Sequence, residues 1–165
     1  MLAKLIEQKN TDVNQLSKQF DRWLFEDRGR QVRGIEYFLN KRSEITDKLI
    51  ISASSEVGIN EINDFGIFAV GGYGRNELHP FSDIDLLLLS ESELSSANEK
   101  KIELFISLLW DLGMEVGHSV RTVKQSKDQA RKDIYTMTNM LEFRKLIGQE
   151  SIHESFIKIL NTKNL

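Results

Sequence analysis

The chain has 165 residues, of which 40% are hydrophobic, 28% charged and 8% aromatic. This is the composition of one ordinary globular domain, and it excludes collagen-like, low-complexity and strongly disordered classes. The formal net charge is −3. Because proteins that bind a phosphate backbone usually carry a basic surplus, we expect no nucleic-acid partner.

The sequence contains no cysteine, which excludes disulfides, thiolate zinc sites and a cysteine nucleophile, and fits a cytoplasmic protein. The longest purely apolar run, residues 86–89, is far too short to span a membrane. The first residues are charged within two turns, unlike a signal peptide. We therefore expect a cytoplasmic chain with no membrane partner.

The first part of the chain predicts a pair of helices, because apolar residues recur at three- and four-residue steps. The apolar stripe of the first helix is Leu16, Phe20, Trp23 and Leu24. The stripe of the second is Ile35, Phe38, Leu39, Ile45 and Leu49. A turn is expected between the two helices at residues 28–30, which contain a glycine between two arginines.

After residue 64 the pattern changes to short apolar runs that predict strands. Strands are expected at residues 65–70, 84–89 and 115–123. A helix that ends at Gly113 separates the second strand from the third, and Ser96 with Glu99 reads as its capping box. Two further capping boxes, at residues 126–129 and 151–154, predict helices near the end of the chain.

One segment combines two features of phosphate chemistry. Gly71 and Gly72 end the first strand before a short helix, and glycine lets the backbone approach a phosphate closely. Ten residues later, Asp83 and Asp85 are two apart at the start of a strand, so their side chains share a face. Two such carboxylates repel unless a cation lies between them, and Mg²⁺ takes carboxylates plus substrate phosphates. The pattern indicates phosphoryl or nucleotidyl transfer.

Each feature alone has a structural alternative. A glycine pair is usually a turn, and an Asp-x-Asp pair at a strand start is usually a solvated edge or cap. Their combination between two hydrophobic strands favours the functional interpretation. A buried strand with four consecutive leucines, residues 86–89, has no structural need to begin with two aspartates unless its end opens onto a site.

This segment resembles the nucleotidyltransferase superfamily of DNA polymerase β, whose signature is a glycine pair, a spacer and Asp-hydrophobic-Asp. Within it, the chain is similar to the N-terminal domain of the family of bifunctional PII uridylyltransferase/uridylyl-removing enzymes, over about residues 20–150. The segments that carry the resemblance are 71–87, 109–111 and 115–122. The resemblance implies an α+β, polymerase β-like nucleotidyltransferase fold: a small mixed sheet flanked by helices, with an N-terminal helical pair.

The resemblance also implies roles for individual residues. Asp83 and Asp85 would be the catalytic metal ligands for Mg²⁺ or Mn²⁺, and Gly71, Gly72 and Ser82 would bind the triphosphate of UTP. Arg75 is a further phosphate-binding candidate, with an alternative in which it only caps the loop through Glu77. The implied reaction is transfer of UMP to a tyrosine of the PII nitrogen-regulatory protein.

Two departures from the family pattern stand out. Many polymerase β-like enzymes carry a third carboxylate on the next strand, and here Ser119 falls at that place, with Glu115 as a possible substitute. The family's enzymes are also far longer. Nothing here resembles their uridylyl-removing and glutamine-sensing modules, and His79, His118 and His153 lack a ligand spacing, which favours structural roles. Glutamine is thus expected as an effector of the full-length enzyme only.

The expected organisation has an N-terminal helical segment at 1–62, a nucleotidyltransferase core at 63–124, and C-terminal helices at 125–165 as the truncated start of a larger helical region. Two alternatives stay open for the function. One is an adenylyl- or other nucleotidyltransferase with another acceptor, because no motif here fixes the base. The other is a non-catalytic, nucleotide-binding regulatory module, which the missing third carboxylate favours.

Overall fold

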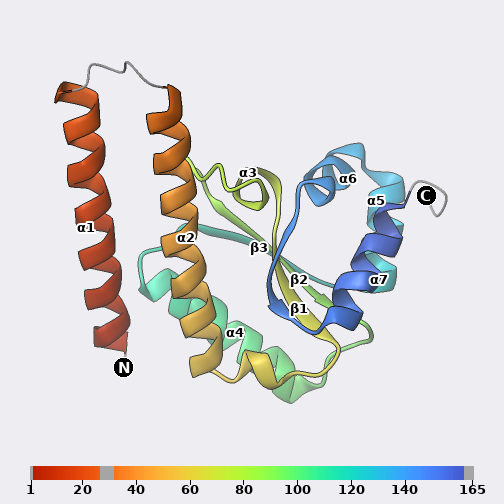
Figure 1. Cartoon of the computed structure of the whole chain (residues 1–165). Coiled ribbons are helices and arrows are strands. Elements are labelled where there is room, and N and C mark those ends of the chain that lie inside the picture. Colours follow the sequence, from red (N-terminus) through yellow and green to blue (C-terminus); the bar gives the residue numbers. More distant parts are fainter. Residues whose placement is uncertain (1, 27–31, 162–165) are drawn as a thin grey trace.

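The computed structural model describes residues 2–26 and 32–161 and has four strands in one mixed sheet (Figure 1). The strands are β1 (Phe65–Ala69), β2 (Ile84–Ser90), β3 (Val116–Thr122) and β4 (Arg144–Gly148). Their order across the sheet is β3-β2-β1-β4. β1 is antiparallel to both β2 and β4, whereas β2 and β3 are parallel. The chain therefore has the α+β class and mixed sheet expected from the sequence.

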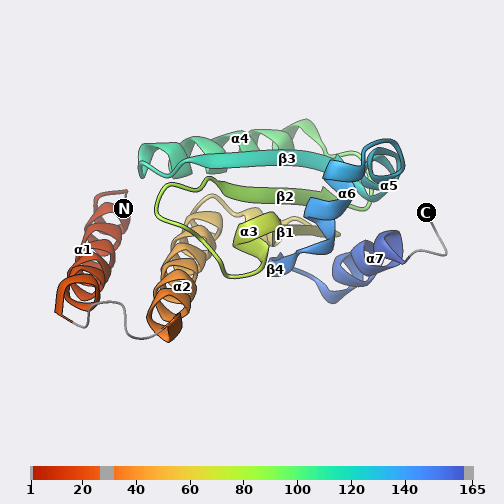
Figure 2. The same cartoon turned by 90° about the horizontal axis from the view of Figure 1, so that it is seen from above.

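Helices cover both faces of this sheet (Figures 1 and 2). The helices are α1 (Leu2–Glu26), α2 (Val32–Glu56), α3 (Gly71–Gly74), α4 (Ser96–Asp111), α5 (Val123–Lys132), α6 (Ile134–Leu141) and α7 (Glu150–Leu160), with a 3-10 turn at Ile59–Glu61. Side chains of β1 and β2 alternate between the two faces. Leu86 and Leu88 pack in the core with α2 and α4, and Leu87 and Leu89 pack in a second core with α5, α6 and α7.

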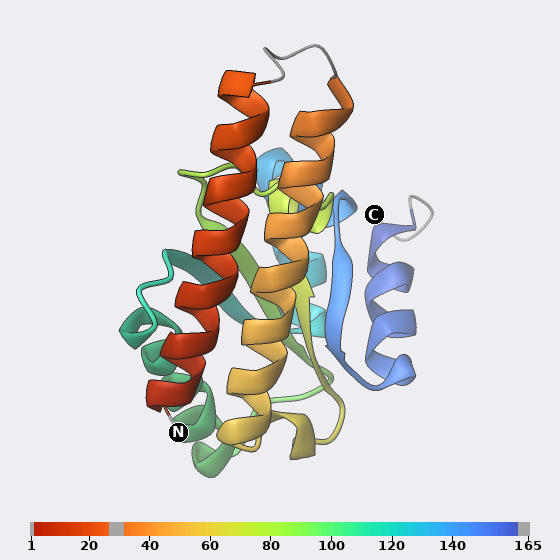
Figure 3. The ribbon, with the colours of Figure 1, turned by 60° about the vertical axis from the view of Figure 1, so that its left-hand side comes forward.

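The N-terminal helices form the expected pair, and they run antiparallel (Figure 3). Leu16 of α1 is buried, as are Leu39, Ile45 and Leu49 of α2. Ile35 was expected in the buried stripe of the second helix, but it is 45% exposed, so that part of the prediction is wrong. The side chains of Phe20, Trp23 and Leu24, and the turn expected at residues 28–30, lie outside the described part of the structure.

The strands match the prediction closely, but the helix starts do not. α4 is capped by Ser95 rather than Ser96: the Ser95 hydroxyl accepts a hydrogen bond from the Asn98 N–H at 3.3 Å. α5 follows β3 without a loop, so its capping box is Thr122 with Gln125, and Ser126 is buried inside the helix. α7 begins after Gln149, with no side-chain cap, and Ser151 lies within it.

The sequence analysis did not predict β4, although this strand forms one edge of the sheet. Arg144 and Lys145 begin this strand, so it lacks the continuous apolar run that predicts a buried strand. Its extended conformation is set by pairing with β1. The segment expected to be only helical after residue 125 thus contributes a strand to the sheet.

Candidate active site

The glycine pair lies at the turn between β1 and α3, directly beside the first residues of β2. The N–H of Val70 donates to the carbonyl of Asp85 at 3.1 Å, and the N–H of Glu77 donates to the carbonyl of Gly72 at 2.9 Å. Gly71 has φ +59°, which a residue with a side chain rarely adopts. These contacts place the N-terminal end of α3 against Asp85.

The Asp85 carboxylate lies between two glycines from different elements. A methyl group at Gly71 would be 3.8 Å from Oδ2 of Asp85, and a methyl group at Gly117 would be 2.8 Å from Oδ1. Gly117 is the residue paired with Asp85 across the parallel strands β2 and β3. Any larger residue at 117 would push the carboxylate, so glycine there leaves room for it.

The two aspartates interact electrostatically. The pKa of Asp85 is raised, first because the side chain is partly buried and second because the charge of Asp83 is nearby. A divalent cation would reverse both effects, since it replaces lost hydration and neutralises the repulsion. Within the described residues no cluster of three histidine, cysteine or acidic side chains is present. A pair of carboxylates completed by substrate phosphates is a set that Mg²⁺ accepts.

The other sequence-predicted residues occupy different surroundings. Arg75 forms ion pairs with Glu77, at 2.8 Å, and with Glu142, so it ties the loop after α3 to the end of α6. Ser82, directly before Asp83, lines a groove of about 540 Å³ facing α1 and α2. Glu115 is exposed and lines the same groove as Ser82. The structure does not bring Glu115 into the cavity that contains Asp85.

Asp85 opens into a cavity of about 210 Å³ between β3 and α6. Its wall includes Ser119, at the place of the third carboxylate in the family pattern. Among the described residues that line it, Asp85 is the one acidic residue. The sequence analysis missed the contributions of Arg121, Tyr135, Thr136 and Asn139. Tyr135 and Asn139 are four residues apart, so they share one face of a helix, and this spacing could have indicated that both line the same cavity.

A buried polar network holds α3 in place. The Tyr73 hydroxyl donates to Oδ1 of Asp47 at 2.6 Å, and Arg144 donates to both Asp47 oxygens at 2.6 and 3.0 Å. Burial and the charge of Asp47 raise the pKa of Tyr73 well above its ordinary value, so the phenol keeps its proton. The network joins α2, α3 and β4, and the sequence analysis did not identify it.

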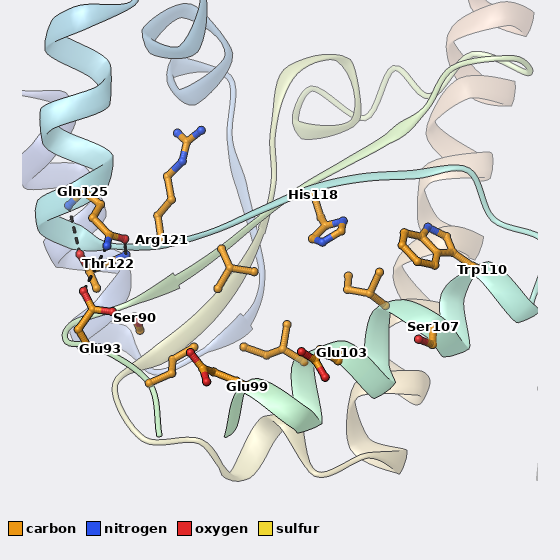
Figure 4. A pocket seen from close by; sticks show the side chains of 14 residues that line it. Ser90, Glu93, Glu99, Glu103, Ser107, Trp110, His118, Arg121, Thr122 and Gln125 are labelled. Carbon is orange, nitrogen blue, oxygen red and sulfur yellow. Dashed lines mark hydrogen bonds between the residues drawn. The ribbon is translucent and has the colours of Figure 1, made fainter. Parts of the chain in front are cut away.

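A larger groove of about 570 Å³ lies on the other face of the sheet, between β3 and α4 (Figure 4). Its walls include Glu99 and Glu103 of α4, and Trp110 packs edge-on against His118 at 6.0 Å between ring centroids. Figure 4 shows Arg121 pointing away from these glutamates. Asp83, Asp85 and the glycine pair do not line this groove, so it is not part of the candidate active site.

The mixed sheet, the glycine turn and the paired aspartates define a nucleotidyltransferase. The sequence model of the nucleotidyltransferase domain family matches residues 56–138, and the chain belongs to this family. Its match to uridylyltransferase relatives covers most of the chain and lies in their N-terminal region. Among the described residues no helix combines the length and apolar character needed to cross a bilayer.

Two curated relatives are bifunctional uridylyltransferase/uridylyl-removing enzymes. The one from Pseudoalteromonas translucida (strain TAC 125) is 40% identical over 92% of this chain, and the one from Stutzerimonas stutzeri (strain A1501) is 38% identical over 87%. The matched region is only 17% and 16% of the length of these relatives. A toxin–antitoxin crystal structure with AMP-PNP aligns with a TM-score of 0.43 and 17% identity, over 68% of this chain and 85% of its own.

Proposed function

We propose that the chain transfers UMP from UTP to a tyrosine of the PII nitrogen-regulatory protein and releases pyrophosphate. The observation that carries the proposal is the Asp85 carboxylate beside the N-terminal end of α3, with the charge of Asp83 near it. The choice of uridylyl rather than another nucleotidyl group rests on the relatives, whose names describe uridylyltransferases. The proposal concerns transfer only, and glutamine stays an expected effector of the full-length enzyme.

In this scheme Asp83 and Asp85 hold Mg²⁺ or Mn²⁺. The cation supplies charge for the oxygens of the transferring phosphoryl group when it is bound. Gly71 and Gly72 leave the backbone open to the triphosphate. Ser82, which precedes Asp83 in the chain, is proposed as a further phosphate-binding residue. Arg75, through its ion pairs with Glu77 and Glu142, fixes the loop that carries these groups. The Arg75 guanidinium is partly exposed and can still be reached by a phosphate, so we keep it as a proposed phosphate-binding group.

A tyrosine acceptor suits a site without a third carboxylate. The hydroxyl of tyrosine has an ordinary pKa near 10, far below that of a sugar hydroxyl, so it needs less assistance to lose its proton. Ser119 faces the Asp85 cavity where a base would otherwise lie. The same observation favours a second candidate function, a non-catalytic module that binds nucleotide without transferring it.

Label transfer separates these functions. The intact protein is incubated with α-labelled UTP, Mg²⁺ and purified PII, and label is followed on PII. We expect metal-dependent labelling that unlabelled UTP suppresses and that ATP and CTP at the same concentration do not. Stronger suppression by ATP than by unlabelled UTP would indicate an adenylyltransferase. Nucleotide binding without any labelling would support the non-catalytic module.

A further inference from the structure

We propose that Asn139 is a further substrate-binding residue, whose side-chain amide donates a hydrogen bond to the triphosphate of the nucleotide. The inference rests on the proposed function and adds one residue to its binding site. Asn139 lies on α6, and none of the motifs that the sequence analysis identified includes it. Its place in the site follows from the way α6 packs against the glycine turn.

The Asn139 side chain lies against the glycine turn, next to Asp85. A methyl group at Gly71 would be 3.8 Å from Oδ1 of Asn139 and also 3.8 Å from Oδ2 of Asp85. Apart from adjoining residues and the backbone of α3 itself, these two side chains supply the atoms nearest to that point. Both side chains also line the same cavity. A phosphate that approaches the backbone at Gly71 therefore meets the amide as well as the carboxylate.

Contacts between α6 and α3 hold Asn139 in this position (Figure 2). Glu142 directly follows α6, and it forms an ion pair with Arg75, which directly follows α3. The two backbones also pack closely there, because a methyl group at Gly74 would overlap the carbonyl oxygen of Glu142. Asn139 lies about one helical turn before Glu142. The same contacts therefore fix the distance between the amide and the glycine turn.

The Asn139 amide has hydrogen-bonding groups that the described part of the chain leaves unused. Among the described residues its side chain has no hydrogen bond and no ion pair, and it is half-buried. A triphosphate offers only acceptor oxygens, whereas the amide nitrogen carries two N–H donors. A half-turn about the Cβ–Cγ bond brings this nitrogen to the place that the amide oxygen occupies. The amide can therefore donate to a phosphate at the glycine turn.

The charges around the turn favour a neutral donor at this place. Asp83 and Asp85 bring negative charge to the site, and the Arg75 guanidinium already has two carboxylate partners. A neutral amide binds phosphate without the cost of taking another charge out of water. A hydrogen bond to a charged phosphate oxygen is also stronger than a hydrogen bond between neutral groups. Asn139 thus complements the backbone of the glycine pair.

Two ligands distinguish a contact with phosphate from a contact with the nucleoside. Calorimetry measures the dissociation constants of UTP and of inorganic tripolyphosphate, each with Mg²⁺. Asn139→Ala removes the amide, and we expect both dissociation constants to rise by a similar factor of about ten. Asn139→Asp keeps the shape of the side chain but replaces the N–H donors with negative charge. We expect it to raise both dissociation constants further than Asn139→Ala does.

Thr138 provides the matched controls, because it is the preceding residue on α6, is exposed and does not line the cavity. Thr138→Ala and Thr138→Asp should leave both dissociation constants within about twofold of those of the unsubstituted protein. Thr138→Asp adds the same charge one residue away, so it measures the long-range effect of that charge. Thermal unfolding checks the fold, and Asn139→Ala should keep Tm within about 2 °C because its amide has no partner among the described residues.

Three results would overturn the inference. Weaker binding of UTP with unchanged binding of tripolyphosphate would show that Asn139 contacts the nucleoside. Tighter binding by Asn139→Asp would identify a metal ligand, because Mg²⁺ prefers a carboxylate. Unchanged binding of both ligands by both Asn139 variants would show that the amide takes no part. If the unsubstituted protein binds neither ligand, the proposed function itself is refuted, whereas binding that the Asn139 variants leave intact refutes this inference alone.

Discussion

Arg144 donates two hydrogen bonds to Asp47, at 2.6 and 3.0 Å, across 97 residues of sequence. The pair joins α2 to β4, and both residues lie outside the segment 56–138 that the family model matches. Because Asp47 also accepts a hydrogen bond from Tyr73, the pair fixes the short helix that begins with the glycine turn. The N-terminal helices thus help to position the candidate phosphate site.

Asp47→Ala should lower the free energy of unfolding by about 2–3 kcal/mol, because it leaves the buried Tyr73 hydroxyl and the partly buried Arg144 guanidinium without their partner. It should also weaken Mg²⁺–UTP binding by loosening α3. Tyr73→Phe removes one hydrogen bond and should cost about 1 kcal/mol. Urea unfolding and calorimetry measure the two effects.

Lys41→Ala is the control for this network, since Lys41 forms an exposed ion pair with Glu44 on the same helix. Exposed pairs contribute little, so the urea midpoint of Lys41→Ala should stay close to that of the unsubstituted protein. If Lys41→Ala and Asp47→Ala unfolded at the same urea concentration, the stabilising role assigned to Asp47, Arg144 and Tyr73 would be contradicted.

Alanine substitutions at Gly72 and Gly74 should affect different properties: Gly72→Ala should weaken nucleotide binding, and Gly74→Ala should destabilise the fold. A methyl group at Gly74 would lie 1.9 Å from the carbonyl oxygen of Glu142, so the backbone must move, at a cost of about 3 kcal/mol. At Gly72 the nearest atom, the carbonyl oxygen of Glu77, is 3.6 Å away, which is ordinary contact. Gly72→Ala should therefore fold normally but bind Mg²⁺–UTP about tenfold more weakly, because the methyl group crowds the phosphates. Normal UTP affinity in that variant would place the phosphates elsewhere.

Asp85→Asn should stabilise the metal-free protein. The pKa of Asp85 is raised in the folded state, so at neutral pH its charge disfavours folding, and this cost is present above its ordinary pKa. Removing the charge should raise Tm by about 2 °C, a modest gain because the side chain is partly solvated. The same variant should lose metal-dependent UTP binding and label transfer. Asp128→Asn, an exposed position on α5, should change neither property.

Acid should destabilise the C-terminal helix through Glu150. Hydrogen bonds from Lys145, and then from His153 at 2.8 Å, lower the pKa of Glu150 to about 2. A lowered pKa means that the carboxylate contributes stability above its ordinary value of 4.5, and that this stability is lost as the pH falls from 4.5 towards 2. Glu150→Gln should flatten the fall of Tm in this window. Glu154→Gln, exposed on the same helix, should leave the fall unchanged.

The candidate phosphate and metal residues could be recognised in the sequence because the pattern they form is local. The strand β1, the glycine turn and the paired aspartates lie within residues 65–85, where alternation along a strand and the freedom of glycine dictate their placement. The helical pair was expected from its apolar periodicity, whereas the mixed sheet was expected from the resemblance to the nucleotidyltransferase family. Helix caps were predicted one to four residues away from their observed places, since several serines compete as caps and only the junction with the preceding strand selects one.

The tertiary structure alone decided what surrounds Asp85. The cavity depends on α6 packing beside β2 and β3. The residues that β3 and α6 contribute to its wall, from Gly117 to Met140, lie 32 to 55 positions beyond Asp85 in the sequence. Glu115, a candidate third acid by spacing, faces the groove with Ser82 instead. Strand β4 and the ion pair of Asp47 with Arg144 exist only because the chain returns to β1 after α6. Contacts between distant segments depend on the packing of the whole chain, which local sequence patterns do not encode.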